Sequence, residues 1–362
     1  MKENTNLRIP HLCLLLLCLA ILACAEPPQP ASVRIIPVPN GGITPDAVVD
    51  DKGVVHLAYF RDDDVYYIRS EDNGQSFSES IRVNSEPETA QAGMFRGPDI
   101  DVAPDGRVHV VWYSNAFQRK LPPEEWGVHY ASLGPSKAAF TPAQNLNHIP
   151  SDNYSIAANQ GSVAVVWTAD SLYVQTSKDD GRTFSEPEAV GIADPCECCA
   201  TKVYFSDTGD LYIAYREKAD NIRDMHLLVR RAGETSFNRS LLSQTSWQID
   251  ACPMSGSYLS EHEDGLVIGW ETKGQIFFGR TDTAGQLHES GETMVSEQGK
   301  YPVVLTTPDG ATLVAWKQNT TLAWRMYDAE GNRLERQDTV SDISPHRPAG
   351  VVTSDGTVLL FP

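Results

Sequence analysis

The chain has 362 residues, 41% of them hydrophobic, and its formal net charge is −19 at pH 7. This excess of carboxylates argues against nucleic acid, and against an anionic lipid surface, as a docking partner. It does not argue against an acidic ligand, because a local cluster of cationic side chains can lie within a negative envelope.

The N-terminal segment has the pattern of an export signal. Lys2 and Arg8 precede an apolar stretch over residues 12–23 that is shorter than a typical membrane-spanning helix. This pattern predicts a signal peptide over residues 1–23. The segment Ile-Leu-Ala-Cys that ends at Cys24 resembles a bacterial lipobox, and this resemblance implies a lipidated Cys24. A plain signal peptide followed by an incidental cysteine is the alternative.

The proline-rich residues 24–32 are expected to form an extended, lipidated tether, and residues 33–362 a single domain without an internal linker. Two or more lipid chains on Cys24 would anchor the protein stably in a membrane. We therefore expect an exported, membrane-anchored lipoprotein that faces the periplasm or the cell surface, and we expect a monomer.

A turn of the Asp-Gly type, or a close variant, recurs seven times at intervals of about 45 to 55 residues between short apolar strands. The turn glycines are Gly53, Gly106, Gly161, Gly209, Gly265, Gly310 and Gly356. The strand after each turn ends on an aromatic residue: Tyr59, Trp112, Trp167, Tyr215, Trp270, Trp316 and Phe361. We expect two-residue hairpin turns at the glycines and structural packing for most of the aromatic residues. The period predicts an all-β protein, a β-propeller of seven blades, with six blades as the alternative.

The two ends of the predicted domain complement each other. The last repeat, residues 348–361, offers only two strands, whereas residues 33–38 form a strand with no repeat of its own. We expect the N-terminal strand to join the C-terminal repeat and close the ring, since this removes an open sheet edge.

Two segments between the third and fourth strands of their repeats share the pattern Ser-x-Asp-x-Gly-x-Ser/Thr-Phe. Their marker residues are Ser70, Asp72, Gly74 and Phe77 in one and Ser177, Asp179, Gly181 and Phe184 in the other. The Asp and Ser side chains can bond backbone groups, the glycine can take a left-handed conformation, and the aromatic ring can pack beneath the turn. On these motifs the chain resembles the Asp-box (BNR) repeat proteins of the sialidase-like propeller superfamily. The resemblance implies a structural role for the boxes, on the outer rim.

The resemblance does not extend to ordinary exo-sialidases. Their Arg-Ile-Pro motif is expected at the start of the first blade, but the only copy here, at Arg8, lies in the predicted signal peptide. Seven blades also depart from the six of that enzyme group. We therefore do not expect ordinary exo-sialidase activity.

In a propeller, the loops that lead into the first strand of each blade and those that leave the second strand converge on one face, which is the default ligand site. Four arginines on these loops could hold a carboxylate or sulfate by paired hydrogen bonds: Arg96, Arg216, Arg223 and Arg347. The alternative is that each arginine pairs with a nearby acid. Tyr301 and Glu271, on neighbouring repeats, are the candidate nucleophile and base. The long loop over residues 114–126 could be a lid or an inert insertion.

Four cysteines lie on the lead-in loops of two successive blades: Cys196, Cys198, Cys199 and Cys252. An even count in an exported protein favours disulfides, and the simplest pairing joins the Cys196–Cys199 segment to Cys252 and forms a second bond within the segment. The alternative is a soft metal centre for copper or zinc. No other cofactor is expected.

These observations give two hypotheses. In the first, the chain binds an acidic or sulfated glycan on the arginine-bearing face, and whether it also hydrolyses that glycan is left open. In the second, it is a non-catalytic interaction propeller of the cell envelope that handles a metal or redox partner through its cysteines.

Overall fold

The computed structural model describes residues 1, 32–341, 343 and 346–362. The predicted signal peptide, Cys24 and nearly all of the predicted tether lie outside the described residues. Within the described part of the chain, no helix is long and apolar enough to cross a membrane.

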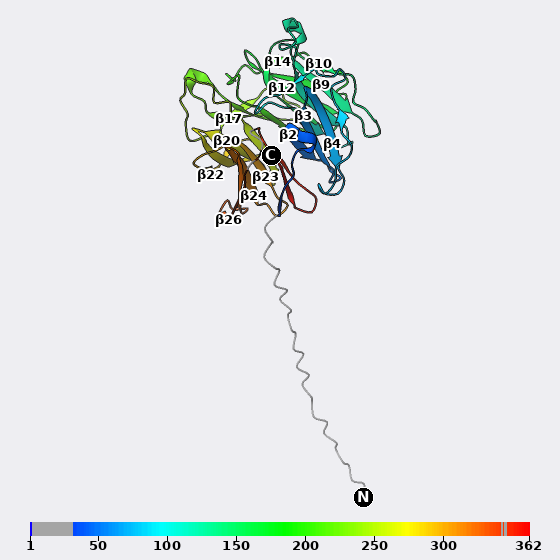
Figure 1. Ribbon diagram of the computed structural model, residues 1–362. Helices are drawn as coiled ribbons and strands as arrows, with labels where there is room; N and C mark the ends of the chain where they lie inside the picture. Colours follow the sequence, from blue (N-terminus) through cyan, green and yellow to red (C-terminus); the bar gives the residue numbers. More distant parts are fainter. Residues whose placement is uncertain (2–31, 342, 344–345) are drawn as a thin grey trace. The chain divides into compact units, whose positions relative to one another are not determined.

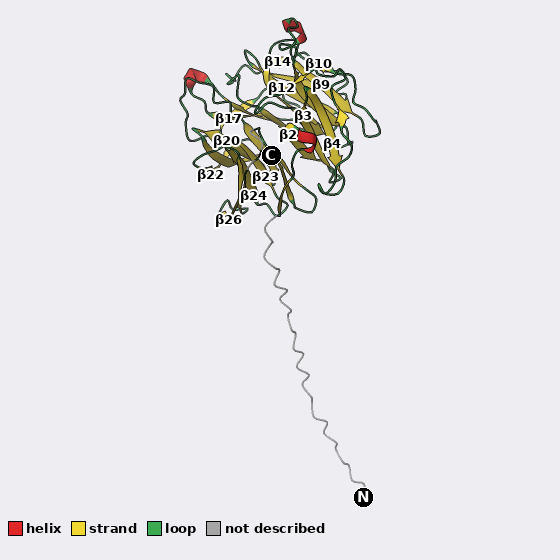
Figure 2. Ribbon diagram, in the orientation of Figure 1, coloured by secondary structure: helices red, strands yellow, loops and turns green. Residues whose placement is uncertain are grey.

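Alternating apolar residues and short turns produce seven small sheets arranged around a common axis (Figures 1 and 2). The first sheet consists of β2 (Ile43–Val49), β3 (Val55–Arg61), β4 (Asp64–Ser70) and β5 (Ile81–Arg82). The second consists of β6 (Ala90–Gln91), β7 (Asp99–Val102), β8 (Val108–Ser114), β9 (Val128–Leu133) and β10 (Gln144–Asn145). The third consists of β11 (Asp152–Asn159), β12 (Ser162–Thr168), β13 (Leu172–Ser177) and β14 (Glu188–Ala189).

The fourth, fifth and sixth sheets repeat the four-stranded antiparallel order, and the seventh has three strands. The fourth consists of β15 (Lys202–Phe205), β16 (Leu211–Arg216), β17 (Met225–Arg230) and β18 (Asn238–Leu241). The fifth consists of β19 (Ser257–His262), β20 (Gly265–Thr272), β21 (Gln275–Asp282) and β22 (Leu287–Ser296). The sixth consists of β23 (Lys300–Thr306), β24 (Thr312–Gln318), β25 (Thr321–Tyr327) and β26 (Arg333–Val340). The seventh consists of β1 (Val33–Ile35), β27 (Ala349–Val352) and β28 (Val358–Phe361). Three short 3-10 helices, η1 (Pro39–Gly41), η2 (Pro123–Glu125) and η3 (Ala219–Asn221), interrupt the loops.

The first long strand of each sheet lies nearest the axis and contacts its counterpart in the next sheet, in the order β2, β7, β11, β15, β19, β23 and β27. Strand β27 in turn contacts β2, so the seven sheets form a ring. The fold is therefore an all-β propeller of seven blades, which confirms the predicted fold. In the last sheet, β1 pairs in parallel with β28, with Val33 opposite Val358, so both ends of the domain share one blade.

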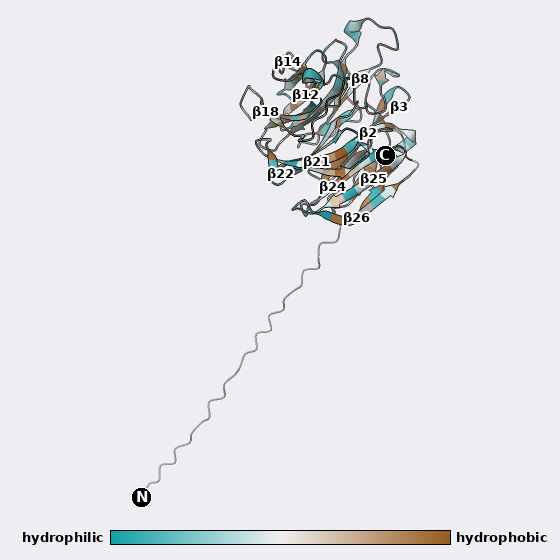
Figure 3. Ribbon diagram, turned by 90° about the vertical axis from the view of Figure 1, so that its left-hand side faces the viewer, coloured by the Kyte–Doolittle hydropathy of each residue, from teal (hydrophilic) through white to brown (hydrophobic). Residues whose placement is uncertain are grey.

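The hydrophobic core is divided among the blades. In Figure 3 the brown, hydrophobic residues concentrate in the strands, whereas much of the loops is teal or pale. The seven aromatic residues that end the second strands are each at most 1% exposed. None of the four tryptophans in that set is therefore a stacking platform for a ligand, and their role is packing between sheets.

The repeat turns differ from the expectation in one respect. Five of the seven are three-residue loops rather than two-residue turns. In the first blade, for example, Asp50 N–H donates to the Val54 carbonyl, and Gly53 N–H donates to the Asp50 carbonyl. Gly53 has a φ of 77°, the left-handed conformation that follows a type I turn in such loops. Glycine is required at the third loop position.

Both Asp boxes have the predicted turn geometry. The Ser177 hydroxyl accepts from Gly181 N–H at 2.9 Å, and Asp179 accepts from the N–H and hydroxyl of Thr183 at 2.9 and 2.7 Å. The box at Ser70 repeats these bonds with Asp72, Gly74 and Ser76. Hydrogen bonds to the carboxylates lower the pKa of Asp72 and of Asp179 to about 2. The aromatic residues pack onto neighbouring blades, Phe77 against Phe361 and Phe184 against Tyr130.

Candidate functional site

A cavity of about 770 Å³ opens among lead-in loops and second-strand exits, where the sequence predicted a ligand face. Residues 93–96 before β7 and 298–301 at the start of β23 form much of its wall. Residues 317–320, at the end of β24 and in the turn before β25, complete it, with contributions from Met254 and Gly274. We call it the Lys317 cavity, because Lys317 is its most unusual residue.

Lys317 is a buried cation for which the described part of the chain provides no counter-ion. Its residue is 3% exposed, and its Nζ has no hydrogen-bond partner among the described residues. Burial alone lowers its pKa from 10.5 to about 8, so the amine is still mostly protonated at neutral pH. A buried ammonium group that lacks a partner is costly and would be stabilised by an anion in the cavity.

Tyr301 lines the same cavity, and Glu271 lies near enough for its charge to act on the Tyr301 hydroxyl. Tyr301 lines it, with its ring stacked on Phe95 at a centroid distance of 6.3 Å and its backbone at a φ of 53°, which is rare for a non-glycine residue. Burial, and then the charge of Glu271, raise the pKa of the Tyr301 hydroxyl. Glu271 is buried at the end of β20, and Gly274 N–H donates to its Oε1 at 2.7 Å. Its Oε2 has no hydrogen-bond partner within the described part of the chain.

The predicted arginines lie in two places. Arg96 lines the Lys317 cavity, with its guanidinium over the Phe95 ring at 4.7 Å and an ion pair to Asp152. Burial raises the pKa of Asp152 to about 6. Arg347 N–H donates to the Met94 carbonyl at 2.7 Å, which ties its loop to the cavity wall. The guanidinium of Arg347 donates to the Pro98 carbonyl at 2.9 Å. It also lies close enough to a group of charged side chains near the propeller axis to act on the pKa of Asp99.

These axial charges tie the blades together across the ring. Lys202 of β15 donates to Asp46 of β2 at 3.1 Å and to Asp99 of β7 at 2.9 Å. The two carboxylates are almost fully buried, and Lys202 is mostly buried, so the three charges depend on one another. Burial raises the pKa of the neighbouring Asp101 to about 7. We assign this group a structural role.

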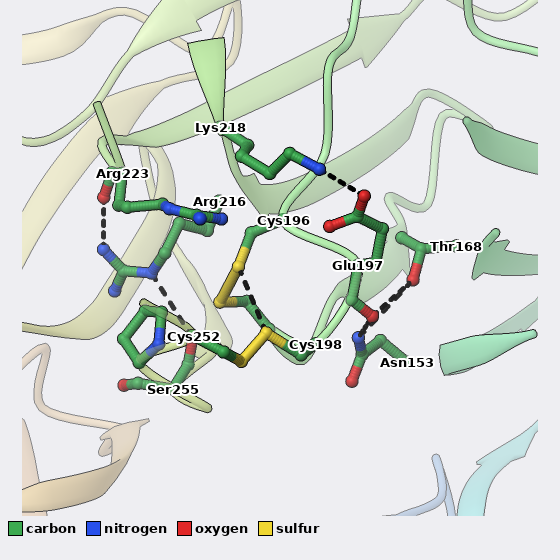
Figure 4. Close-up of a disulfide and its surroundings, with 12 residues drawn as sticks. Asn153, Thr168, Cys196, Glu197, Cys198, Arg216, Lys218, Arg223, Cys252 and Ser255 are labelled. Carbon is green, nitrogen blue, oxygen red and sulfur yellow. Dashed lines mark hydrogen bonds and ion pairs between the residues drawn. A yellow bond between two sulfur atoms is a disulfide. The ribbon is translucent and has the colours of Figure 1, made fainter. Parts of the chain in front are cut away.

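Arg216 and Arg223 lie beside the cysteines instead of the cavity (Figure 4). Arg216 is fully buried, and its three nitrogens donate to the backbone carbonyls of Arg223, Ser255 and Glu271. It therefore joins two loops and strand β20 and is not presented to solvent. The four predicted arginines do not form one cationic group, because Arg216 and Arg223 project from the fourth blade while Arg96 and Arg347 flank the second.

The cysteine loop is held by contacts from its own and neighbouring blades. Cys196 N–H donates to the Arg216 carbonyl at 2.8 Å, and Cys199 N–H donates to the Cys196 carbonyl at 3.0 Å. The Glu197 carbonyl accepts from Asn153 and from Thr168 of the third blade (Figure 4).

The four sulfurs form one cluster. Cys196 is bonded to Cys199 and Cys198 to Cys252, with Cα–Cα distances of 5.4 and 6.3 Å. This is the pairing that the sequence favoured as simplest. The two bonds are adjacent, with Cys196 Sγ 3.6 Å from Cys198 Sγ. The sulfurs of Cys196, Cys198 and Cys252 lie within 4.8 Å of one another, an arrangement that could hold a metal ion as thiolates.

The sequence analysis did not single out two residues of the cavity, the buried cation Lys317 and the aromatic wall residue Phe95. Lys317 was visible only as one polar residue at a second-strand exit, and Phe95 as a neighbour of Arg96. Residues 114–126, predicted as a lid or an inert insertion, contribute nothing to the lining of the Lys317 cavity. In this loop Phe117 is 62% exposed and packs edge-on against Trp126.

The comparisons with solved structures show the fold. A Hadza microbial sialidase, Hz136, is 13% identical with a TM-score of 0.51, and the match covers 76% of this chain and 63% of that one. This chain therefore spans less than two thirds of that sialidase. The protein U3-55K is 11% identical with a TM-score of 0.53, over 87% of this chain and 86% of that one. A Dyadobacter fermentans protein of unknown function is 14% identical with a TM-score of 0.49, over 86% of each chain.

No curated protein matches the sequence. The family model described as the BNR repeat-like domain matches residues 52–314, which is most of the chain. The repeats, the two Asp boxes and the ring of seven sheets agree with this match. The chain therefore belongs to the BNR repeat-like family of sialidase-like β-propellers.

Proposed function

We propose that this protein binds an acidic or sulfated saccharide in the Lys317 cavity, with Lys317 and Arg96 contacting its anionic group. The observation that carries the proposal is the buried Lys317 amine, which lines the cavity and has no partner among the residues described. A carboxylate or sulfate would replace the hydration that this amine loses on burial.

The walls favour a saccharide over a small inorganic anion. The volume of about 770 Å³ lies within the range of small-molecule sites and is far larger than one sulfate needs. Phe95 and Tyr301 offer an apolar wall for the less polar face of a sugar ring, and Gln298, Gln318 and Asn319 offer hydrogen bonds to hydroxyl groups. One structural neighbour is a sialidase, which fits a glycan ligand.

We propose that Tyr301 and Glu271 form the reactive pair if a bound glycan is cleaved. Glu271 would take the proton of the Tyr301 hydroxyl, and the phenolate oxygen would attack the anomeric carbon. The bond from that carbon to the glycosidic oxygen would break, and this oxygen would leave with the proton that Glu271 had taken. The Oε2 of Glu271 is buried without a hydrogen-bond partner among the described residues, and the effect of its charge on the Tyr301 hydroxyl indicates that the two groups are close; both observations support this assignment.

The test is a binding screen against sialylated, uronic and sulfated saccharides and their neutral counterparts. Titration calorimetry should give binding only to anionic members, and Lys317→Met should reduce the affinity at least about tenfold. Lys137→Met removes the same charge from an exposed site and should leave binding unchanged. Equal binding by both variants and the parent would reject the site.

A second variant separates binding from cleavage. Tyr301→Phe should keep the affinity for the saccharide found in the screen while abolishing any release of reducing sugar. Retained cleavage by Tyr301→Phe would reject the reactive pair and leave the binding site standing.

We propose also that the chain is exported and anchored through a lipid on Cys24. The charged start, the apolar residues 12–23 and the cysteine that follows them support this location. Radiolabelled palmitate should be incorporated into the parent chain in a bacterial host, and Cys24→Ser should abolish the label. Equal labelling of both chains would reject lipidation at Cys24.

A further inference from the structure

We propose that the cysteine cluster is a redox-gated copper site, in which the thiolates of Cys196, Cys198 and Cys252 bind one Cu(I) ion once both disulfides are reduced. This site is separate from the Lys317 cavity and does not depend on the proposed saccharide function.

The spacing of the sulfurs fits one ion. Three sulfurs that each lie about 2.3 Å from a central metal in a trigonal plane are about 4 Å apart. Cys196 Sγ and Cys198 Sγ are 3.6 Å apart, and all three proposed ligand sulfurs lie within 4.8 Å of one another. Small side-chain rotations are therefore sufficient to form the site.

The backbone of the cluster is held by bonds that do not involve sulfur. On one side, Cys196 and Cys199 are fixed by hydrogen bonds to backbone carbonyls, and Glu197 is held by the third blade. On the Cys252 side, Arg216 donates to the Ser255 carbonyl and Lys300 donates to the Pro253 carbonyl, each at 3.4 Å. The sulfurs should therefore stay together after their covalent bonds are reduced.

The charges around the cluster favour thiolates. Figure 4 shows Arg216, Arg223 and Lys218 in the surroundings of Cys196, Cys198 and Cys252. Nearby cationic groups stabilise a thiolate relative to a thiol. Lys218 forms an ion pair with Glu197, so these two charges offset each other and the stabilisation of the thiolates falls to Arg216 and Arg223.

The pattern of the cysteines favours Cu(I) over Zn(II). A structural zinc site needs four ligands in a tetrahedron, and Cys198 and Cys199 are adjacent, which hinders both from binding the same ion. Three soft thiolates suit Cu(I). We assign Cys199 the role of a resolving thiol instead of a ligand, because the group of sulfurs that lie within 4.8 Å of one another consists of Cys196, Cys198 and Cys252.

A dithiol is the electron donor for the reduction of both disulfides. One thiolate of the dithiol attacks Cys252, which is exposed, and releases the Cys198 thiolate. The second thiol of the dithiol then frees Cys252 and leaves as a disulfide, so two electrons and two protons are delivered. The Cys198 thiolate lies close enough to attack Cys196 and free Cys199, and a second dithiol completes the reduction by the same steps.

The experiment uses the full chain with Cys13, Cys18 and Cys24 replaced by Ser, so that only the four clustered cysteines remain. This chain is reduced with dithiothreitol, separated from it without oxygen, and titrated with Cu(I) against a coloured Cu(I) chelator. We expect one tightly held ion per reduced chain and none per oxidised chain. Equal copper retention by oxidised and reduced chains would overturn the proposal.

Matched variants test the ligand set. Cys252→Ser should weaken Cu(I) binding at least tenfold, whereas Cys199→Ser should leave it within about twofold, and circular dichroism of both chains checks their folding. X-ray absorption of the loaded parent should show three sulfur donors and provides a readout that does not depend on the variants. Four sulfur donors, or equal losses in the two folded variants, would overturn the assignment.

Discussion

Lys317→Met should stabilise the free protein while it abolishes anion binding. Burial lowers the Lys317 pKa from 10.5 to about 8, a difference of about 2.5. At about 1.4 kcal/mol for each pKa unit, the buried ammonium costs up to about 3 kcal/mol at neutral pH. Methionine has a similar length and no charge, so it should remove this cost and fill the same space.

The pH dependence of the stability gain in Lys317→Met tests whether the Lys317 charge is its cause. Between pH 8 and 10.5 the unfolded chain holds the Lys317 proton and the folded chain does not, so stability rises with pH across this window. The advantage of Lys317→Met should be fully present below pH 8 and should disappear by about pH 10.5. Urea unfolding followed by tryptophan fluorescence measures it, with Lys137→Met as the control. A Lys317→Met variant that is less stable than the parent at pH 7, or a stability gain that does not change with pH, would show that the Lys317 charge does not destabilise the folded chain.

Three further predictions concern the propeller itself, and urea unfolding measures each. Lys202→Met leaves two buried aspartates without their cation and should cost about 3–5 kcal/mol; a loss below about 1 kcal/mol would contradict its structural role. Gly181 has a φ of 75°, and Gly181→Ala places a Cβ 1.8 Å from the Tyr130 hydroxyl oxygen, so this substitution should cost about 1–3 kcal/mol. The control Gly191→Ala adds a Cβ in open space and should be nearly neutral. Asp101 has its pKa raised from 3.8 to about 7, so stability should fall as pH rises through that interval, and Asp101→Asn should flatten the profile.

The fold was predictable because its signals are local. Each turn glycine and each second-strand aromatic acts within its own repeat, so their period gives the number of blades before any long-range contact is known. The turn length was predicted wrongly because two- and three-residue loops both place glycine in the left-handed conformation. Gly53 illustrates this ambiguity, since its positive φ occurs in a three-residue loop.

The site was only partly predictable because it depends on how separate blades face one another. The sequence placed Tyr301 and Glu271 on neighbouring repeats, and in the structure Tyr301 lines the cavity while the charge of Glu271 acts on its hydroxyl. The sequence could not show that Arg216 is enclosed by three backbone carbonyls. Nor could it show that Lys317 is buried without a partner in the described chain, since that requires the loops of two other blades.

The most direct test of the central claim is calorimetric titration with a matched pair of saccharides that differ only in a carboxylate or sulfate and its neutral replacement. We expect measurable affinity for the anionic member alone, and loss of that affinity in Lys317→Met but not in Lys137→Met. Equal affinity for the two saccharides, or binding that survives the loss of Lys317, would contradict an anion site in this cavity.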